Sequence, residues 1–400
     1  MDSIWEENVQ LPRFSALEGD LRTDVLIIGG GLAGLLCAWR LTRAGVACAL
    51  IEENRIMHGV SGRTTAKVTS QHGCIYGKLL DRFGTEAARL YWQVNEDALA
   101  AFRELAREAD SDFESQNSYL YATDGEEKLK AEMAAYQKLK IPARWETSLP
   151  LPFPVSGAVC LADQAQLHPI KLAAHIAKGL KIFEHTKAVA FLGNRVQTPN
   201  GTITAKKTIV ATHFPILNKH GAYFLKLYQQ RSYVLALENA GPLEGMYLDC
   251  AENGLSVRSA GRWLLLGGGG HRTGKQGEKL EVAGAGGKRV FPPGAYWGPL
   301  GHTGLYDAGW NALYRPIQQE DTRFICGNRI SKVGHEHIHG SGHDPDGSDP
   351  GKRESLCCPV FTLPKYAAQA ASGQRSGCGA SFDPSCNTPM SASRLRFVLE

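Results

Sequence analysis

The chain has 400 residues, 43% of them hydrophobic and 21% charged, which suffices for one large or two medium domains with their own cores. A mean hydropathy of −0.24, without a long apolar run, argues against a transmembrane helix. The net charge of +4 comes from 44 basic and 40 acidic residues with no block of like charge, which argues against a dedicated nucleic-acid binder. The first residues are acidic where a signal peptide needs bases, so we expect a cytoplasmic protein.

The ten cysteines divide into two groups. The first five lie in apolar segments, at positions 37, 48, 74, 160 and 250, as buried free thiols do in a reducing compartment. The last five lie in a tail of different composition. None has the C-x-x-C spacing, so the sequence gives no support to a zinc or thioredoxin-like site.

The N-terminal part predicts a strand–helix–strand unit. Residues 24–29 (DVLIIG) form a short apolar run rich in β-branched side chains, typical of a buried parallel strand. A glycine cluster follows, then a helical pattern over 32–44 that Gly45 can end. The apolar run 46–52 predicts a second strand that ends at Glu52. We therefore expect one βαβ unit over 24–53.

Further elements follow from periodicity and turn signals. Helical patterns cover 83–110, 126–140 and 167–180, the last with Pro169 near its first turn. Strand patterns dominate 181–212, where Asn200-Gly201 predicts a two-residue hairpin. Strands are also expected over 208–212, 231–238, 246–249 and 263–269.

The glycine motif of the first unit indicates a nucleotide site. Gly29 permits a tight turn, Gly31 lets backbone approach a pyrophosphate, and Gly34 lets the helix pack closely on the strand. The helix N-terminus offers N–H groups and a positive dipole to phosphates. Glu52, at the end of the next strand, can accept hydrogen bonds from the hydroxyls of an adenosine ribose. The alternative is a glycine-rich turn without a ligand.

Three segments together carry a family resemblance. They are DVLIIGGGLAGLLCAWRL (24–41), SGRTTAKVTSQHG (61–73) and KKTIVATHFPI (206–216). In this order they resemble the D-amino-acid-oxidase/glycine-oxidase (DAO) type of FAD-dependent oxidoreductase, and most closely a subgroup of bacterial flavoproteins with a C-terminal Rieske domain. The resemblance covers about residues 1–276.

The resemblance implies an α/β fold: a Rossmann-like FAD-binding domain with an interleaved α+β substrate domain. The FAD-binding parts would be 1–72 and 181–220, with a glycine-rich return over 266–277; the substrate-domain parts would be 73–180 and 221–265. Residues 278–400 are atypical and are expected to be disordered.

The resemblance also implies a set of FAD contacts. They are Gly29, Gly31, Leu32, Ala33, Gly34, Glu52, Ser61, Arg63, Thr64, Thr65, Lys67, Val189 and Thr212. The four residues from 61 to 65 in this set would contact phosphate or ribityl groups, and the backbone around Val189 the adenine. Lys67 and Gln71 would lie near the isoalloxazine ring, where a positive charge stabilises the anionic reduced form. The alternative for Arg63 and Lys67 is a position at a loop surface. The Asn/Ser-Ala-Gly pattern of the amino-acid oxidases is replaced here by Thr64-Thr65-Ala66-Lys67.

Arg231, Tyr233 and Arg258 are the substrate candidates, because amino-acid oxidases grip a carboxylate with a Tyr/Arg pair and arginine presents a planar fork. Inter-strand ion pairs are the alternative. His72, His168 and His213 are expected to be structural. The glycines at 267–270 are expected to lie on the flavin side, and no catalytic acid–base residue is assigned.

The tail has a further peculiarity. It lacks the family's closing segments, but a one-nucleotide shift of degenerate codons for 301–336 permits family-like text in the correct order. We therefore expect about 278–400 to be an out-of-frame translation. The cluster His335, His337, His339 and His343 has metal-like spacing, but its surroundings cannot hold ligands rigidly, so no metal is predicted.

The function implied is oxidation of a small amine or amino acid by hydride transfer to flavin, with electrons passing to oxygen or an iron–sulfur acceptor, and with activity impaired if the native C-terminal part is lost. Two alternatives remain open: an NAD(P)-dependent Rossmann dehydrogenase and a non-catalytic truncated flavoprotein remnant.

Overall fold

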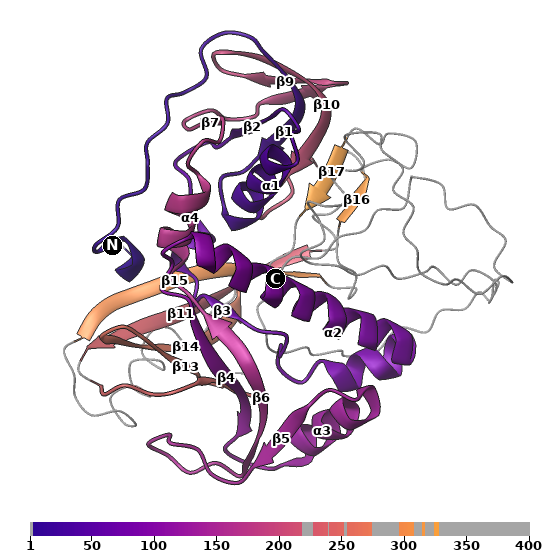
Figure 1. Ribbon diagram of the computed structural model, residues 1–400, viewed down its shortest axis with the longest axis vertical. Coiled ribbons are helices and arrows are strands. Elements are labelled where there is room, and N and C mark those ends of the chain that lie inside the picture. Colours follow the sequence, from indigo (N-terminus) through magenta and orange to yellow (C-terminus); the bar gives the residue numbers. More distant parts are fainter. Residues whose placement is uncertain are drawn as a thin grey trace, which may run out of the picture.

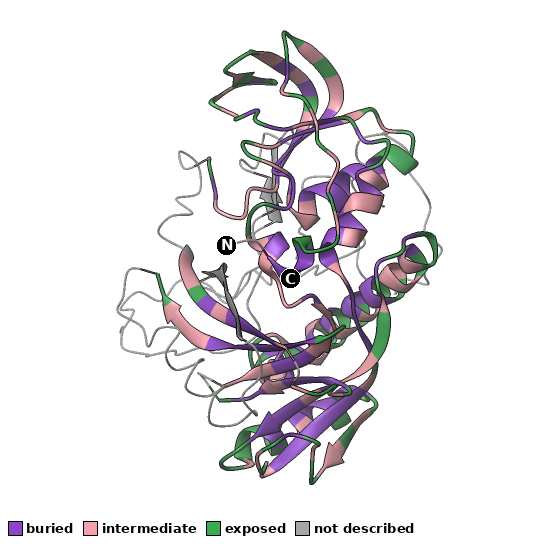
Figure 2. Ribbon diagram, turned by 90° about the vertical axis from the view of Figure 1, so that its left-hand side faces the viewer, coloured by how far each residue is buried: buried purple, intermediate pink, exposed green. Residues whose placement is uncertain are grey.

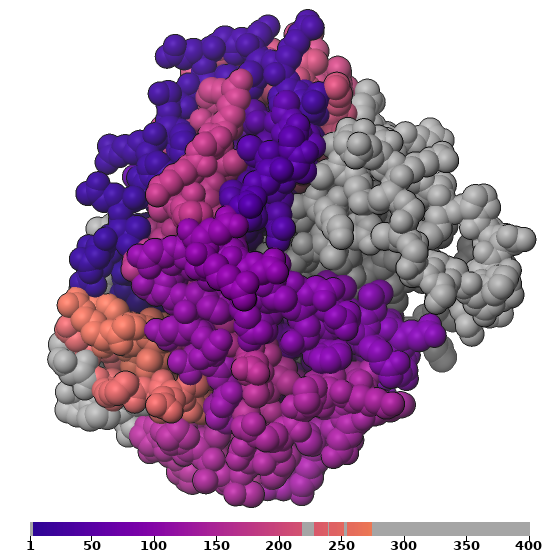
Figure 3. All heavy atoms as spheres, in the orientation of Figure 1, coloured from indigo at the N-terminus to yellow at the C-terminus, as the bar shows by residue number. Residues whose placement is uncertain are grey.

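The computed structural model describes residues 3–217, 227–238, 240–251 and 254–273, together with the backbone alone of 296–307, 314–316 and 324–327. Two lobes, each built on one β-sheet, lie on either side of the long helix α2 (Tyr76–Glu108) (Figure 1). The space-filling view shows the same arrangement, with α2 crossing between the lobes (Figure 3).

The N-terminal lobe has a mainly parallel sheet in the order β16-β17-β10-β1-β2-β7, extended by β8 and β9. Its strands are β1 (Leu21–Ile28), β2 (Cys48–Ile51), β7 (Ile182–Phe183), β8 (Ala190–Leu192), β9 (Arg195–Thr198), β10 (Gly201–Val210), β16 (Tyr314–Pro316) and β17 (Phe324–Gly327). The β1 residues 25–28 are buried, as expected for an apolar central strand. The predicted Asn200-Gly201 hairpin joins β9 and β10.

Helices α1 (Leu32–Arg43) and α4 (Pro169–Ile176) cover this sheet. Gly45 follows α1 with a φ of 75°, a conformation that suits glycine at a helix end. α4 begins with His168, whose Nδ1 accepts the Lys171 N–H, and with a proline at its first position. This confirms a structural role for His168. α4 packs against α1, although the sequence division places 73–180 in the other domain.

The second lobe has a sheet in the order β15-β11-β14-β13-β12-β4-β6-β3, with β5 beside β6. Its strands are β3 (Lys67–Val68), β4 (Glu114–Ala122), β5 (Ala143–Glu146), β6 (Gly157–Gln166), β11 (Leu227–Glu238), β12 (Met246–Asp249), β13 (Ser256–Ala260), β14 (Trp263–Arg272) and β15 (Tyr296–Asp307). α2 and α3 (Glu127–Leu139) cover one face, and buried residues, purple in Figure 2, run through the strands. The apolar segment 149–155 packs against the other face.

α2 links the two lobes because its apolar stripe reaches two cores. Its N-terminal half, with Leu79 and Tyr91, packs with α3 and the second sheet. Its C-terminal half, with Val94 and Leu105, packs with α1 and α4. Gly84, with a φ of 81°, breaks the helical geometry within it.

Two further segments lie in a different lobe from the one that the domain boundaries expected from the sequence assign to them. The glycines at 267–270 do not return to the N-terminal lobe, because they lie inside β14, which pairs with β11 and β13. The segment leaving the N-terminal lobe already joins the second sheet at Lys67, where β3 pairs with β6. The physical reason is the same in both: backbone pairing with neighbouring strands, on both sides for β14 and at the sheet edge for β3, decides which lobe a segment joins.

In the tail, β15 pairs with β11 and β17 pairs with β10, so at these strands the expectation of disorder is not met. The other residues of 278–400, including the four-histidine cluster at 335–343, lie outside the described residues. Among the residues that the structure describes, no helix is long and apolar enough to cross a membrane. The five cysteines whose side chains it describes are free thiols, as expected; Cys37, Cys160 and Cys250 are buried, whereas Cys48 and Cys74 are only partly buried.

Candidate dinucleotide site

A cavity of about 410 Å³ opens at the carboxyl ends of β1 and β2. This edge of a parallel sheet is where nucleotides bind in open α/β folds. Among the predicted contacts, its lining includes Gly29, Gly31, Ala33, Glu52, Ser61 and Thr212. It also includes residues that the sequence did not single out: Asn54, His58, Lys187 and Phe214. The structure thus gathers six predicted residues from four segments around one space.

The first and last glycines of the motif have no room for a side chain. Gly29 has a φ of 112°, and a Cβ there would lie 2.4 Å from the Ala211 carbonyl oxygen. A Cβ on Gly34 would lie 1.9 Å from the carbonyl oxygen of Gly29. Gly34 therefore sets how closely α1 approaches the turn, as the motif predicts.

The middle glycine is different. A Cβ on Gly31 would meet only the Ser61 hydroxyl, at 3.0 Å. Gly31 is the N-cap of α1 and provides no side-chain cap, while the Leu32 N–H donates to Ser61 Oγ over 3.1 Å. The first turn of α1 therefore presents N–H groups and a hydroxyl to the cavity, a donor set that fits a pyrophosphate.

Glu52 lies at the end of β2 and holds the backbone on both sides of the cavity. One carboxylate oxygen accepts the Gly30 N–H over 2.7 Å, and the other accepts the Asn54 N–H over 2.9 Å. A carboxylate offers about four acceptor positions, so two remain for a ribose diol. The geometry fits the predicted role.

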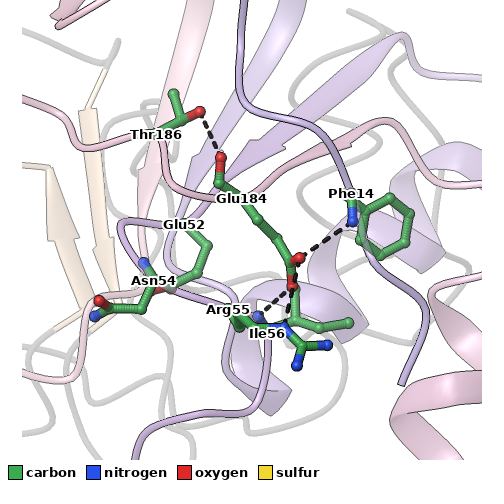
Figure 4. A network of polar contacts seen from close by, with 7 residues as sticks. All are labelled: Phe14, Glu52, Asn54, Arg55, Ile56, Glu184 and Thr186. Atoms are coloured by element: carbon green, nitrogen blue, oxygen red, sulfur yellow. Dashed lines mark hydrogen bonds and ion pairs between the residues drawn. The ribbon is translucent and has the colours of Figure 1, made fainter. Parts of the chain in front are cut away.

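Glu184 was missed by the sequence reading and lies behind Glu52 (Figure 4). It follows β7 and is 1% exposed. Its carboxylate accepts the Phe14 N–H over 3.1 Å and the Ile56 N–H over 2.8 Å, and it lies 3.8 Å from Arg55 Nε. It thereby ties the N-terminal segment and the loop after β2 to β7.

Thr186 completes the same network (Figure 4). Its hydroxyl donates to the Glu184 carbonyl over 2.9 Å, and its N–H donates to the Glu52 carbonyl over 2.8 Å. The Leu17 N–H donates to the Thr186 hydroxyl over 3.0 Å. The only sequence signal for this network is a polar run that follows a short apolar one at 182–186.

The segment after the cavity turns back on itself. Arg63 donates to the His58 carbonyl over 2.7 Å, which matches the alternative of a loop position for this arginine. The Thr64 carbonyl accepts the Trp5 indole N–H over 2.9 Å, and its hydroxyl accepts the Ala66 N–H over 3.1 Å. Thr65 is partly buried beside it.

Lys67 points into the second lobe. Its ammonium donates to the Tyr247 carbonyl and to Ser256 Oγ, both over 2.7 Å. Burial, and then the positive charge of Arg258, lower the pKa of Lys67 to about 7. Lys67 is therefore not at a loop surface but is held at the junction of the lobes.

Val189 and Thr212 flank the cavity differently. The Val189 side chain is 63% exposed, and its N–H donates to the Gln197 carbonyl over 2.8 Å. Its neighbour Ala188 lines the cavity instead. Thr212 lines it too, and its hydroxyl donates to the Phe214 carbonyl over 2.7 Å. His213, between Thr212 and Phe214, has a φ of 63°.

The three substrate candidates do not come together. Arg258 is 2% exposed, donates to the Leu167 carbonyl over 3.4 Å, and lies 5.3 Å from the Trp5 ring; burial lowers its pKa to about 9. Across the sheet, Arg258 is paired with Leu265 of β14, which is paired with Ala236 of β11. Arg231 lies five residues before Ala236 on β11 and is exposed.

Two aromatic contacts complete the candidates. The Tyr233 ring stacks on His271, with 5.8 Å between the ring centroids. His72 Nδ1 lies 2.9 Å from the Tyr91 hydroxyl in a buried pair, which is a structural role, as expected.

Comparison with known proteins assigns the family. The profile described as "FAD dependent oxidoreductase" (DAO) matches residues 24–348, beyond the 276 residues on which the sequence resemblance rests. A putative Rieske 2Fe-2S iron-sulfur protein, YhfW of Bacillus subtilis, is 34% identical over 70% of this chain and 58% of its own length. The gamma-glutamylputrescine oxidoreductase of Escherichia coli is 24% identical over 50% of this chain and 51% of its own.

Solved structures share the fold. Glycine oxidase from Geobacillus kaustophilus superposes with a TM-score of 0.63 at 18% identity, covering 77% of this chain and 89% of that one. L-proline dehydrogenase from P. horikoshii gives 0.62 at 18%, covering 80% and 90%. The chain spans only a little over half the length of the two curated relatives above. Because the family profile covers most of the chain, this protein belongs to the FAD-dependent oxidoreductases of the DAO family, with FAD as the family's cofactor.

Proposed function

We propose that the chain binds FAD with its adenosine diphosphate in the cavity at the ends of β1 and β2 and oxidises a small amine or amino acid. The observation that carries the proposal is the cavity itself, in which the side-chain-free turn at Gly29, the first turn of α1 and the Glu52 carboxylate face one space. Family membership supports FAD rather than a nicotinamide dinucleotide.

Each part of the cavity has a chemical task in this proposal. The N–H groups of the first α1 turn, including that of Ala33, and the Ser61 hydroxyl bind the pyrophosphate, while the Leu32 N–H holds Ser61 in place. Glu52 accepts from the ribose hydroxyls, while Glu184 and Thr186 hold the surrounding loops in place. Ala188 and Thr212 border the adenine end, so Val189 contributes through its neighbour's backbone rather than its side chain.

Lys67 is the proposed charge partner of the flavin ring. Bound flavin supplies a two-electron acceptor for a hydride from the substrate carbon. Lys67, fixed by Tyr247 and Ser256, carries a proton that is easily lost at neutral pH, because its pKa lies near 7. A negative charge nearby would favour its charged form. Lys67 would therefore be protonated when the flavin ring carries a negative charge and would lose its proton more easily when the ring is neutral.

The substrate class rests on the relatives. The matched oxidoreductase acts on gamma-glutamylputrescine and the structural neighbours include glycine oxidase and L-amino acid deaminase, so an amine or amino acid is proposed here. Arg231, Tyr233 and Arg258 remain individual candidates for its carboxylate. Oxygen or an iron–sulfur centre is the proposed acceptor, the latter supported by the Rieske relative.

The tail bears on whether this chain is active. Residues from about 278 to 400 are proposed to be an out-of-frame translation, on the evidence of the family-like text in the shifted reading of 301–336. Two observations count against this proposal: the family profile matches as far as residue 348, and β15 and β17 pair with strands of the two sheets. Sequencing the gene around the codon of Gly277 tests this: an uninterrupted frame without family text one base away contradicts it.

Anaerobic spectroscopy tests the function. The purified chain, and a version with the shifted frame restored, are mixed with FAD and then with small amines and amino acids. We expect bound flavin absorbance that bleaches with at least one substrate in the restored version. Bound flavin that no amine or amino acid reduces contradicts the substrate class, and a failure of both versions to retain FAD contradicts the whole proposal.

A further inference from the structure

A second cavity, of about 220 Å³, lies beside the turn that joins β13 to β14. Its wall also takes in the N-terminal segment, the start of β4 and the end of β6. Among the described residues, none that lines it also lines the dinucleotide cavity. Pockets for drug-sized ligands span about 300–1,000 Å³, so this space suits a smaller molecule.

Two buried polar side chains of this wall each have an atom without a hydrogen-bond partner among the described residues. Arg258 is 2% exposed, and the unpartnered atom is its Nε. Its other two nitrogens donate to the Ser259 and Leu167 carbonyls over 3.3 and 3.4 Å. Gln166 is 4% exposed, and its amide nitrogen donates to Glu114 over 2.7 Å, whereas its Oε1 has no partner. Since an unpaired buried polar atom costs free energy, the wall presents one donor and one acceptor that a ligand can satisfy.

The charges of the wall indicate what kind of ligand this is. Of its three acidic residues, Glu7 and Asp112 each already have a cation at ion-pair distance. The third, Glu114, accepts the amide of Gln166, and its charge acts on Arg258 from farther away. The cavity therefore offers one carboxylate and one guanidinium that form no ion pair with each other. A zwitterion complements this arrangement, because it brings a cation to one and an anion to the other.

The guanidinium of Arg258 is poorly compensated in its present surroundings. Burial lowers its pKa to about 9, and the Glu114 charge opposes this only in part. The Trp5 ring, 5.3 Å away, gives a cation–π contact rather than a counter-ion. The charge of Arg258 also lowers the pKa of Lys67. A carboxylate in the cavity would stabilise both cations, and the planar guanidinium can bind it with two hydrogen bonds.

The rest of the wall is apolar. Ile4, Trp5, Leu167 and Trp263 line the cavity, and all four are largely buried core residues. They cover the space between the charged groups and leave room for a short hydrocarbon side chain. A bound molecule with an aliphatic part would remove this surface from water.

We propose that this cavity binds a small aliphatic α-amino acid as the zwitterion, with its carboxylate at Arg258 and its ammonium at Glu114 and the Gln166 carbonyl oxygen. The inference goes beyond the proposed function, because such binding needs neither FAD nor oxidation. Glu184 and Thr186 hold the N-terminal segment on the first lobe. A bound amino acid would therefore tie this segment to the second lobe.

The test uses the full purified chain without FAD. L-alanine, L-valine and L-leucine are the probes, followed by thermal unfolding and isothermal titration calorimetry. The matched comparisons are the analogues of the tightest binder that lack its ammonium or its carboxylate; for L-valine these are isovalerate and isobutylamine. We expect saturable binding that raises the unfolding temperature, and binding of each analogue that is about tenfold or more weaker.

Substitutions separate the two charges. Arg258→Met should abolish binding. Glu114→Gln, at an exposed position, should weaken binding by about tenfold because it removes the charge facing the ammonium. Glu146→Gln is the matched control in the same sheet: this glutamate pairs with Arg144 at 3.4 Å on β5, outside the cavity wall, and its loss should leave binding unchanged. Circular dichroism checks the fold, and if Arg258→Met does not fold, Glu114→Gln and the analogues decide.

Three results would overturn the inference. Binding of none of the three amino acids removes the site. Equal binding of an amino acid and of either analogue removes the zwitterion. Binding that Arg258→Met and Glu114→Gln both leave unchanged places the ligand elsewhere. Because no arm contains FAD, flavin that is retained and reduced in the separate anaerobic experiment would leave the proposed function standing beside a failed binding test.

Discussion

Glu184 gives the sharpest test of how the cavity is built. Glu184→Ala removes the acceptor of the Phe14 and Ile56 N–H groups, which are then left without their partner behind the cavity. A hydrogen bond to a charged group is worth about 1.5–3 kcal/mol. Two such bonds, lost from a side chain that is 1% exposed, predict a loss of about 3–6 kcal/mol in the free energy of unfolding.

Two further variants divide this effect. Glu184→Gln keeps one acceptor oxygen and turns an N–H group toward one backbone donor, so we expect about half of the alanine effect, roughly 1.5–3 kcal/mol. Glu53→Gln is the matched control, because Glu53 pairs with Lys187 at 3.0 Å in an exposed ion pair with side chains 53% and 66% exposed. Such pairs contribute below about 1 kcal/mol.

Urea unfolding of the protein without FAD measures these losses, and a parallel FAD titration measures their effect on the cavity. The loop tied by Glu184 leads into Ser61, so FAD affinity should fall by about tenfold for each 1.4 kcal/mol lost in loop positioning. If Glu184→Ala unfolds like wild type, or if Glu53→Gln costs as much as Glu184→Ala, the reasoning is refuted.

Three other outcomes are expected. Gly34→Ala places a Cβ 1.9 Å from the Gly29 oxygen and should cost about 1–3 kcal/mol and prevent FAD binding. Gly59→Ala, whose Cβ meets nothing within 4 Å, should leave the free energy of unfolding unchanged in the same urea experiment. Glu132 accepts the Tyr76 N–H at the start of α2, and burial raises its pKa to about 7. Its contribution to the free energy of unfolding is therefore greatest below the pKa that it has in the unfolded chain, and falls as pH rises through about 7. Unfolding measured as a function of pH should show this fall in wild type but not in Glu132→Gln. The lowered pKa of Lys67 means that its positive charge destabilises the fold below about pH 7, and this cost fades as pH rises toward the pKa of the unfolded chain. The free energy of unfolding gained by Lys67→Met should therefore shrink as pH rises. A gain independent of pH would contradict this explanation.

The local elements of the N-terminal lobe follow from the sequence because their signals are local. The run at 24–29, the glycines at 29–34 and Gly45 each specify a strand, a turn and a helix end through their own conformational limits. The hairpin at Asn200-Gly201 is of the same kind. Gly34 could be predicted as a packing glycine because the motif itself fixes its distance from the strand.

What the sequence did not reveal depends on contacts between distant segments. Glu184 serves Phe14 and Ile56, and no periodicity near residue 184 announces either partner. The glycine run in β14 resembles a turn locally but is held in the sheet by its two neighbours. Lys67 looks like a loop residue until β12 and β13 supply its acceptors. These assignments need the tertiary pairing, which single-sequence patterns do not contain.

The most direct test of the account is an equilibrium titration of the purified chain with FAD, followed by quenching of flavin fluorescence. The account predicts saturable one-to-one binding that FMN, which lacks the adenosine half, does not reproduce, that Glu52→Gln weakens and that Gly34→Ala abolishes. Equal binding of FAD and FMN, or FAD binding unaffected by both substitutions, would contradict the placement of the cofactor in this cavity.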